Sequence, residues 1–397
     1  MNNRTKILLF RWLLRINWLP SLLFMYPLAM LRKRLQARHV FFFDRYVLGG
    51  AQRVHLDILE SISEEPKVVF FTRFSPNTVL KSAFESMPNT RCEDIHFWCD
   101  NLFFRLFAVH YWAFFLNRHN NLVVFSSNST FFYDLLPWLR LDFCRIELLH
   151  NFTYGKKGME AFGLANYQFL DKRLTVDAFT AQNIREQYHE HQVPEQFSDR
   201  ILTIEPGVFV PDKMPKKDDA PLMVFYAGRS GVQKRTWLID RIAAHCYQNS
   251  LPVVFHFAGD AEGDLSDFVK KNSILHGQVS DQKIMRNLYS LAHVVILTSA
   301  FEGFPMVIKE GMANGCVPLV TALPGNLTHL RNQENALLIQ EIVNEDLVVK
   351  EGIAQLKWLI QNQEQRKGLS VRAQTYAREH FSRKIFLEKY RALFSEV

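Results

Sequence analysis

The chain has 397 residues, of which 48% are hydrophobic, so it is long and apolar enough to form two domains of ordinary size. Its net charge of +7 suggests a nucleic-acid partner, but eight of the 47 Lys and Arg residues lie in residues 1–39, which contain no Asp or Glu. The remainder is almost neutral, so no nucleic acid is expected. The five cysteines are scattered without zinc spacing, which fits a reducing cytoplasm.

The basic N-terminal segment contains an uncharged apolar run from Ile16 to Leu31, with aromatic residues in it and beside it. A membrane-spanning helix needs roughly 20 apolar residues, and this run is shorter and includes two prolines. No small-residue cleavage site of a signal peptide precedes Arg32. We therefore expect residues 1–39 to lie on an anionic bilayer, at the inner face of the cytoplasmic membrane. The alternative is an added helix that packs on the first domain.

Short apolar runs alternate with helical stretches through the rest of the chain. A segment rich in Pro and charge, residues 210–221, interrupts this rhythm. The pattern predicts an α/β protein with two doubly wound, Rossmann-like domains, residues 40–209 and 222–397, that face a cleft. The predicted strands are 40–43, 68–72, 122–126, 146–149, 222–226, 294–297 and 317–320, with a further strand that enters a Gly-rich turn within 255–263.

Two segments of the first domain have open interpretations. Residues 97–119 are very aromatic, which favours a buried core helix, although contact with a membrane or an acceptor lipid is an alternative. Lys156 and Lys157 are adjacent and suit an anionic acceptor, although solvated loop lysines are the simpler interpretation.

The turn after the strand at 222–226 combines glycine with two cations, Arg229 and Lys234, and leads into a helix from about Arg235. Fixed cations at the carboxyl end of a parallel strand stabilise a departing diphosphate, Arg by bidentate hydrogen bonds and Lys as a point charge. Two solvated surface cations are the alternative interpretation.

The stretch VVILTSAFEGFPMVIKEGMANGCVPLV, residues 294–320, is the most informative part of the chain. It predicts a buried strand, a loop with Glu302, a helix over 306–314 that contains Glu310, and a further strand. The free N–H groups of a helix start bind anions, and carboxylates bind hydroxyl groups. The stretch is therefore suited to a sugar attached to a phosphate, although a βα unit with two surface glutamates is the simpler alternative.

Together these segments resemble the glycosyl transferases group 1 family, whose members are retaining, nucleotide-sugar-dependent enzymes of the GT-B fold. The resemblance implies that Arg229 and Lys234, beside Gly228, neutralise the donor diphosphate. It further implies that Glu302 lies nearest the transferred sugar and that Glu310 binds a hydroxyl of the nucleotide or sugar. The remaining donor-binding positions implied are Gly303, Phe304 and Pro305, with the backbone near Val279 at the nucleobase, and residues 206–210 as the closing strand of the first domain.

The same resemblance implies two sites in the first domain. Gly49 and Gly50 precede a predicted helix and are expected close to the donor phosphate and the acceptor, although a plain turn explains them equally well. His150 ends a predicted strand and is expected to touch the donor sugar, with a structural histidine as the alternative.

The expected activity is transfer of a hexose from a nucleotide sugar, with UDP as the expected carrier, to a growing surface glycan such as lipopolysaccharide, capsule or another lipid-linked saccharide. The acceptor would be deprotonated by the leaving phosphate, because no residue stands out as a covalent nucleophile. The chain has no Asp-x-Asp triplet, so neither a metal nor another cofactor is expected. The alternatives are an epimerase or phosphorylase on the same fold, or a non-catalytic sugar-nucleotide binder in a membrane complex.

Overall fold

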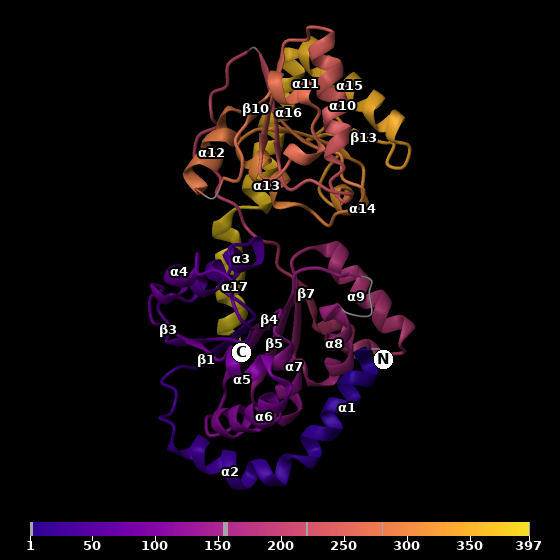
Figure 1. Cartoon of the computed structure of the whole chain (residues 1–397). Helices are drawn as coiled ribbons and strands as arrows, with labels where there is room; N and C mark the ends of the chain where they lie inside the picture. The colour runs from indigo at the N-terminus through magenta and orange to yellow at the C-terminus, as the bar shows by residue number, and fades with distance from the viewer. Residues whose placement is uncertain (1–2, 154–157, 220, 280, 397) are drawn as a thin grey trace. The chain divides into compact units, whose positions relative to one another are not determined.

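The computed structural model describes residues 3–153, 158–219, 221–279 and 281–396. The chain forms two compact units, unit 1 with Met1–Glu205 and Leu387–Val397, and unit 2 with Pro206–Phe386 (Figure 1).

Unit 1 is built on a seven-stranded sheet in the order β3-β2-β1-β4-β5-β6-β7, with every pair of neighbours parallel. Its strands are β1 (His39–Phe43), β2 (Lys67–Phe71), β3 (Thr90–Asp94), β4 (Val123–Ser127), β5 (Cys144–Leu149), β6 (Lys172–Thr175) and β7 (Ile201–Thr203). Its helices are α1 (Asn3–Ile16), α2 (Trp18–Leu31), α3 (Gly50–Ser61), α4 (Lys81–Glu85), α5 (His96–Asp100), α6 (Leu102–Leu116), α7 (Thr130–Leu135), α8 (Met159–Asn166) and α9 (Ala178–Glu190).

Unit 2 is built on a six-stranded parallel sheet in the order β10-β9-β8-β11-β12-β13. Its strands are β8 (Leu222–Ala227), β9 (Val253–Ala258), β10 (Ile274–Leu275), β11 (Val294–Leu297), β12 (Val317–Thr321) and β13 (Leu337–Ile339). Its helices are α10 (Thr236–Gln248), α11 (Asp267–Asn272), α12 (Gln282–Leu291), α13 (Met306–Ala313), α14 (Pro324–Leu327), α15 (Glu345–Gln361) and α16 (Gln363–His380).

The prediction of two doubly wound α/β sheets is confirmed. In each sheet the strand order reverses beside the first strand, between β1 and β4 in unit 1 and between β8 and β11 in unit 2. Ligands of such sheets bind outside the carboxyl ends of the strands at this switch point. The loops that follow β1, β8 and β11 are therefore the places to look for function.

The prediction of a closing strand at residues 206–210 is wrong. Val208 forms only an isolated bridge, to Ser382, and its N–H donates to Phe381 O over 2.7 Å. Val208 is buried in the core of unit 2, so the backbone groups that a strand would offer to the first sheet are already used there. The last strand of unit 1 is β7.

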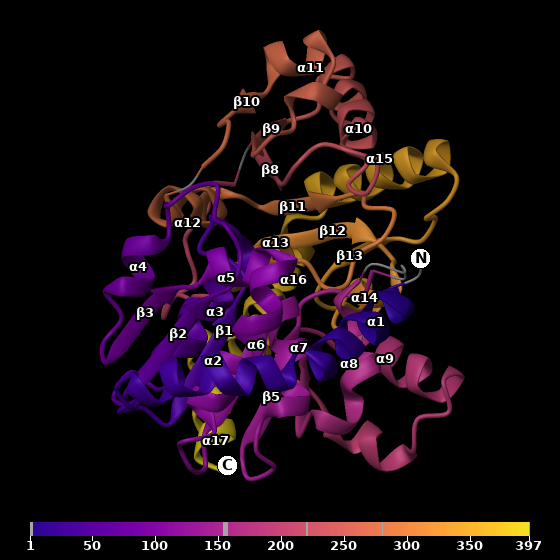
Figure 2. The same cartoon turned by 60° about the horizontal axis from the view of Figure 1, so that its bottom comes forward.

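The N-terminal segment forms two helices that pack on unit 1 (Figures 1 and 2). Helix α2 runs parallel to α6, because contacts recur between residues 89 positions apart. Asn17 Nδ2 donates to Leu106 O over 3.1 Å, and Ser21 Oγ lies 2.8 Å from His110 Nδ1. Within the described part of the chain, no helix is both long and apolar enough to cross a membrane.

Helix α1 is attached to unit 1 at α8. Arg11 Nη2 donates to Ala165 O over 3.1 Å and also bonds to the Asn166 side chain, while Leu14 is fully buried in the core. The packing alternative for residues 1–39 is thus present in the structure. The membrane interpretation depends on the opposite face of these helices.

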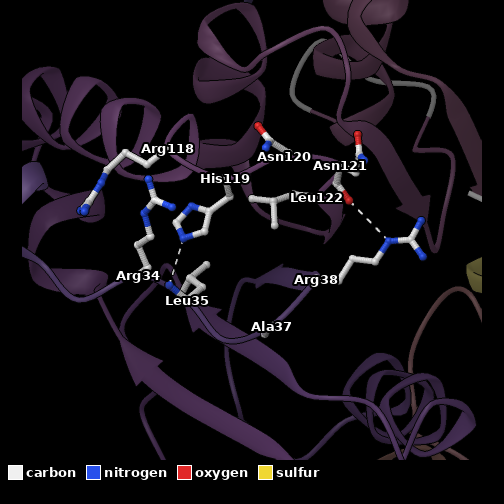
Figure 3. Close-up of a pocket in the computed structure, with 9 residues that line it drawn as sticks. All are labelled: Arg34, Leu35, Ala37, Arg38, Arg118, His119, Asn120, Asn121 and Leu122. Atoms are coloured by element: carbon white, nitrogen blue, oxygen red, sulfur yellow. Dashed lines mark hydrogen bonds between the residues drawn. The ribbon is translucent and has the colours of Figure 1, made fainter.

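The residues between α2 and β1 line a basic pocket of about 600 Å³ (Figure 3). Its lining includes Arg34, Arg38, Arg118 and His119, and Leu35 N–H donates to His119 Nε2 over 2.9 Å. The pocket lies before the first residues of β1 and β4, at the edge of the sheet opposite to the carboxyl ends of these strands.

A buried ion pair joins β5 to β6 in unit 1. Arg173 Nε donates to Glu147 Oε2 over 2.6 Å, and each side chain is only 2% exposed. Tyr133 donates its hydroxyl to the other carboxylate oxygen, and Arg173 Nη1 donates to Tyr188 Oη over 3.2 Å. Such a pair needs all its partners, because either charge alone would be costly in this interior.

The last helix, α17 (Arg383–Ser395), returns the chain to unit 1 from Leu387 onward. The ring of Phe394 lies 5.4 Å from that of His39, 5.8 Å from Phe41 and 5.9 Å from Phe125. Tyr390 beside it is fully buried. The core of unit 1 thus includes side chains from both ends of the sequence.

Candidate active site

The first loop of unit 2 follows β8 and carries Gly228, Arg229 and Lys234. Buried Tyr226 donates its hydroxyl to Arg229 O over 2.7 Å, which fixes the backbone at that residue. The Arg229 side chain is exposed and makes no ion pair with any described residue. It is therefore a cation available to a ligand.

A second loop follows β11, the strand next to β8, and buried Arg235 joins the two loops. Its guanidinium donates to Thr298 O over 2.8 Å, to Ser299 O over 3.1 Å and to Ile342 O over 2.9 Å. The backbone of Arg235 is left-handed, with φ of 48°, which is uncommon for a residue other than glycine. Three carbonyl partners for one side chain explain why this conformation persists.

Lys234 and Glu302, one from each loop, form an ion pair. Ser299 Oγ donates to the same oxygen, Glu302 Oε1, over 3.2 Å. The side chains of Lys234 and Glu302 are 19% and 11% exposed. The pair is therefore mostly buried, but part of each side chain remains accessible to a ligand. The structure thus brings together two residues that the sequence suggested separately.

Glycines allow the backbone to approach both loops closely. A Cβ on Gly259, whose φ is 100°, would lie 2.1 Å from Gly228 O. A Cβ on Gly325 would lie 2.0 Å from Gly303 O. Any side chain at Gly259 or Gly325 would therefore displace a candidate site loop.

Helix α13 begins at Met306, with Pro305 in the extended conformation as its N-cap residue, and ends before Gly315, whose φ is 68°. The predicted helix over 306–314 is thus confirmed to within one residue. Its first turn directs N–H groups toward the loop of Glu302.

Phe304 anchors this loop to the core of unit 2. Its ring centroid lies 4.6 Å from that of His329 and 5.3 Å from that of Phe381. Lys309, only 1% exposed, places its Nζ 4.9 Å from the Phe381 ring and 5.5 Å from the Phe304 ring. The role of Phe304 shown here is packing, because its ring contacts protein side chains.

Glu310 lies on α13 and accepts a hydrogen bond at Oε2 from Tyr289 Oη over 2.8 Å. Burial raises the pKa of Tyr289 well above its usual value, so the hydroxyl keeps its proton. Tyr289 belongs to an apolar cluster with Phe225, and Val279 packs against that cluster. Val279 and Glu310 therefore both border the cluster that contains Tyr289.

In unit 1, Gly49 and Gly50 follow β1 at the switch point and begin α3. Neither residue has a positive φ, and nothing lies within 4 Å of a Cβ built on Gly50. The backbone here does not require glycine, but it leaves open space beside the start of the helix.

His150 follows β5 and pairs with His55 of α3. The two Nε2 atoms are 3.2 Å apart. Burial lowers the pKa of His150 to about 4 and, together with the nearness of His150, lowers that of His55 well below its usual value. Both rings are therefore neutral at pH 7. Lys156 and Lys157 lie outside the described residues.

Over the described ranges, no group of three or more His, Cys, Asp or Glu side chains is arranged to hold a metal ion. The cations Arg229 and Lys234 are the groups of the β8 loop that can meet an anion.

The comparisons with known proteins support the resemblance. Residues 221–358 match the family model described as Glycosyl transferases group 1. The resemblance to this family is confirmed over these residues, which form most of unit 2. The fold of the chain is the GT-B fold.

Solved structures share the fold of this chain over nearly its whole length. Anabaena Alr3699/HepE in complex with UDP has a TM-score of 0.69 at 13% identity, covering 91% of this chain and 100% of its own. A glycosyltransferase from Rickettsia africae ESF-5 has a TM-score of 0.70 at 16% identity, covering 91% and 98%. The apo lipopolysaccharide outer core galactosyltransferase WaaB has a TM-score of 0.65 at 17% identity, covering 90% and 100%. A comparison with curated protein sequences finds no match.

The sequence analysis missed the partners of the candidate residues. Arg235 was noted only as the approximate start of a helix, and Tyr289 and His55 were not singled out. Each contacts a candidate residue or its loop from at least 21 positions away in the chain. No local pattern signals such contacts, although a polar residue on a predicted core face, such as His55, is a usable warning.

Proposed function

We propose that this glycosyltransferase moves a hexose from a nucleotide sugar to a growing surface glycan and retains the configuration of the sugar. The observation that carries the proposal is the placement of Arg229, Lys234 and Glu302 on two joined loops at the switch point of the family-matched unit. The donor carrier we propose is UDP, because the similar HepE was solved with UDP and with UDP-glucose. A lipopolysaccharide-like or other lipid-linked acceptor is favoured by the similarity to WaaB.

In the proposed mechanism the bond between the sugar's anomeric carbon and the diphosphate oxygen breaks, and a bond to the acceptor oxygen forms on the same face. The acceptor proton passes to the leaving phosphate. Arg229 and Lys234 stabilise the charge that develops on the diphosphate, without a metal ion. Glu302, which holds Lys234 in place before the donor arrives, lies beside the transferred sugar.

The remaining candidate residues bind the donor. Glu310, which already accepts a hydrogen bond from Tyr289, also accepts one from a hydroxyl of the nucleotide or sugar. The backbone near Val279 meets the nucleobase. In unit 1, His150 touches the donor sugar, and Gly49 and Gly50 lie near the donor phosphate and the acceptor.

We also propose that the enzyme is peripheral on the inner face of the cytoplasmic membrane through an apolar face of unit 1. This face consists of exposed side chains of α1, α2, α5 and the start of α6: Leu9, Trp12, Leu13, Ile16, Trp18, Leu19, Leu23, Phe24, Leu28, Leu31, Phe97, Trp98, Leu102 and Phe103. Helix α2 packs parallel on α6, and the Phe97 ring of α5 lies 5.4 Å from that of Trp98 and 5.3 Å from that of Phe104 on α6. Exposed apolar area of this extent, bordered by the cations of residues 32–38, suits the interface of an anionic bilayer.

The activity is tested with a panel of nucleotide sugars. A true donor raises the melting temperature, because a ligand at 100 times its Kd stabilises the native state by about 2.7 kcal/mol. Transfer of the selected donor to a saccharide acceptor, followed by NMR of the product's anomeric proton, then reports retention, and EDTA should leave the rate unchanged. Conversion of the donor sugar without an acceptor would indicate an epimerase, and stabilisation by no nucleotide sugar would contradict the proposal.

The membrane face is tested without deleting residues 1–39, because deletion would remove the buried Leu14 and Ala29 from the core. Substituting Trp12, Trp18 and Phe24 by Ser should abolish co-sedimentation with vesicles that contain phosphatidylglycerol. The matched control substitutes Leu141, Val343 and Val371, which are exposed elsewhere, by Ser. Equal vesicle binding by both triple variants would exclude this face.

A further inference from the structure

His55 is a buried polar side chain whose role the proposed mechanism leaves unexplained. It lies on α3, one turn after Gly49 and Gly50, and its ring stacks on that of Phe43 with centroids 4.0 Å apart and planes within 5°. The residue is fully buried, whereas His150 is partly exposed. The only hydrogen bond recorded for His55 among the described residues is the one from its Nε2 to His150.

The hydrogen bond between the two Nε2 atoms constrains where each proton sits. Both rings are neutral near pH 7, because burial disfavours their charged forms. A neutral imidazole has one N–H and one lone pair, so one ring must donate and the other must accept.

The other nitrogen of His55 decides between the two arrangements. Its Nδ1 is buried and has no partner among the described residues. If His55 accepted at Nε2, its proton would sit on Nδ1 as a buried N–H without an acceptor, which is among the rarest unsatisfied groups in proteins. If His55 donates from Nε2, only a lone pair is left unsatisfied.

We infer that His55 is a positioning residue, which donates its Nε2–H to His150 Nε2 and so holds His150 in the tautomer with its proton on Nδ1. His150 then presents an N–H donor, not an acceptor, at its other ring nitrogen, Nδ1. A donor of this kind suits a hydroxyl oxygen of the donor sugar or an oxygen of the departing diphosphate. This last step depends on the proposed function, whereas the tautomer does not.

The hydrogen bond between His55 and His150 also links two elements of the fold. Because His55 belongs to α3 and His150 follows β5, the hydrogen bond ties the helix that begins at Gly50 to the end of a different strand. A change in the α3 start is therefore transmitted to the orientation of the His150 ring.

The tautomer is measured directly by long-range ¹H–¹⁵N NMR on full-length protein with ¹⁵N-labelled histidine, at pH 7.5 and without any ligand. We expect a protonated-type shift for Nδ1 and an unprotonated-type shift for Nε2 of His150, and the reverse for His55. A protonated Nε2 on His150 overturns the inference, whatever the activity of the enzyme.

Two variants test whether His55 sets the tautomer of His150 and thereby affects turnover. His55→Phe keeps the stacking on Phe43 but removes the donor, so the His150 proton should shift toward Nε2 and turnover should fall. Loss of the partner that orients a functional histidine typically costs roughly tenfold or more. His55→Gln retains an N–H donor and should preserve both the His150 tautomer and most of the turnover.

The control is His110→Phe, which removes another buried histidine that has an unpartnered Nε2 but lies on α6 and hydrogen-bonds Ser21. It should leave the His150 shifts unchanged. An unchanged His150 tautomer in His55→Phe would overturn the positioning role. If the tautomer is as inferred but His150→Phe turns over normally, the ligand contact is wrong and the error lies in the proposed function. If His55→Phe does not fold, the measurement on the wild-type protein still decides the tautomer.

Discussion

The two units of the protein share one architecture but hold their candidate residues in different ways. In unit 2 the site is made by two neighbouring loops, joined by Arg235 and by the partly exposed pair of Lys234 with Glu302. In unit 1 the candidate His150 is held by a fully buried partner, and the strands beneath it are joined by the buried pair of Glu147 with Arg173.

This difference between the units reflects two kinds of group in a protein site, those that contact a ligand and those that orient other groups. Groups that meet a charged ligand must stay accessible and exchange partners, which a partly exposed ion pair such as that of Lys234 with Glu302 permits. Groups that only orient others can be fully buried, where each hydrogen bond is stronger and each missing partner more costly. Unit 2 should therefore respond to substitution mainly in its chemistry, and unit 1 mainly in its stability.

The largest effect is expected from Glu147→Ala in unit 1. Removing one member of a buried ion pair costs about 3–5 kcal/mol, because the other charge is left uncompensated. The free energy of unfolding, measured by urea denaturation, should fall by this amount, while Asp142→Ala in the exposed pair with Arg140 should change it little. Equal losses for both variants would remove the proposed contrast between the units.

The next effect concerns unit 2 chemistry. Arg229→Ala and Lys234→Ala should each lower turnover at saturating donor by roughly 100- to 1,000-fold, the usual result of losing one preorganised group that stabilises a developing anion. The melting temperature should change little. Arg241→Ala, which removes an exposed cation paired with Asp346, is the control. Normal turnover in both site variants would contradict the assignment of the diphosphate to this loop.

A smaller loss in the free energy of unfolding is expected when the pH is lowered. His55 and His150 have folded pKa values below their usual range, so between about pH 6.5 and 4 the unfolded chain binds protons that the folded chain does not. Stability is therefore lost as the pH falls, by about 2 kcal/mol between pH 7.5 and 5 for a histidine that titrates near 4. Thermal unfolding of His55→Phe/His150→Phe should show a shallower pH dependence than the wild type, whereas exposed His189→Gln should not.

The smallest effect separates the two glutamates of unit 2. Glu310→Gln should weaken donor binding about tenfold, or roughly 1.4 kcal/mol, as expected for one hydrogen bond to a charged group. Tyr289→Phe should have a smaller effect on affinity, because the carboxylate itself remains. Glu302→Gln should lower kcat more than affinity. Calorimetry with a UDP sugar and steady-state kinetics distinguish these outcomes, and equal behaviour of both Gln variants would merge the two roles.

Much of unit 2 was predictable from the sequence, because its signals are local. The strand over 294–297, the helix from Met306 and the glycine that ends it all follow from short patterns. The pairing of Lys234 with Glu302 did not follow, because it depends on β8 and β11 lying side by side although 66 residues lie between the end of β8 and the start of β11. The prediction of a strand at 206–210 is wrong for the same reason, since the residue that Val208 pairs with, Ser382, lies far along the chain.

The N-terminal segment shows a different limit. Its composition indicates either a helix that packs on the first domain or a segment that contacts a membrane. The structure shows one side of α1 and α2 buried and the other exposed, so the two interpretations apply to opposite faces of the same helices. Composition cannot make this distinction, because it does not say which residues α6 and α8 cover.

The return of α17 to unit 1 affects how the protein is made. Unit 1 takes Tyr390 and Phe394 into its core, and both residues follow the whole of unit 2 in the chain. Domains usually fold in order as they are synthesised, but here the first unit must wait for the second to be completed. A nascent chain that ends at Glu205 therefore lacks part of the core of unit 1, and the loss of α17 would expose the Phe41 and Phe125 side chains that Phe394 contacts.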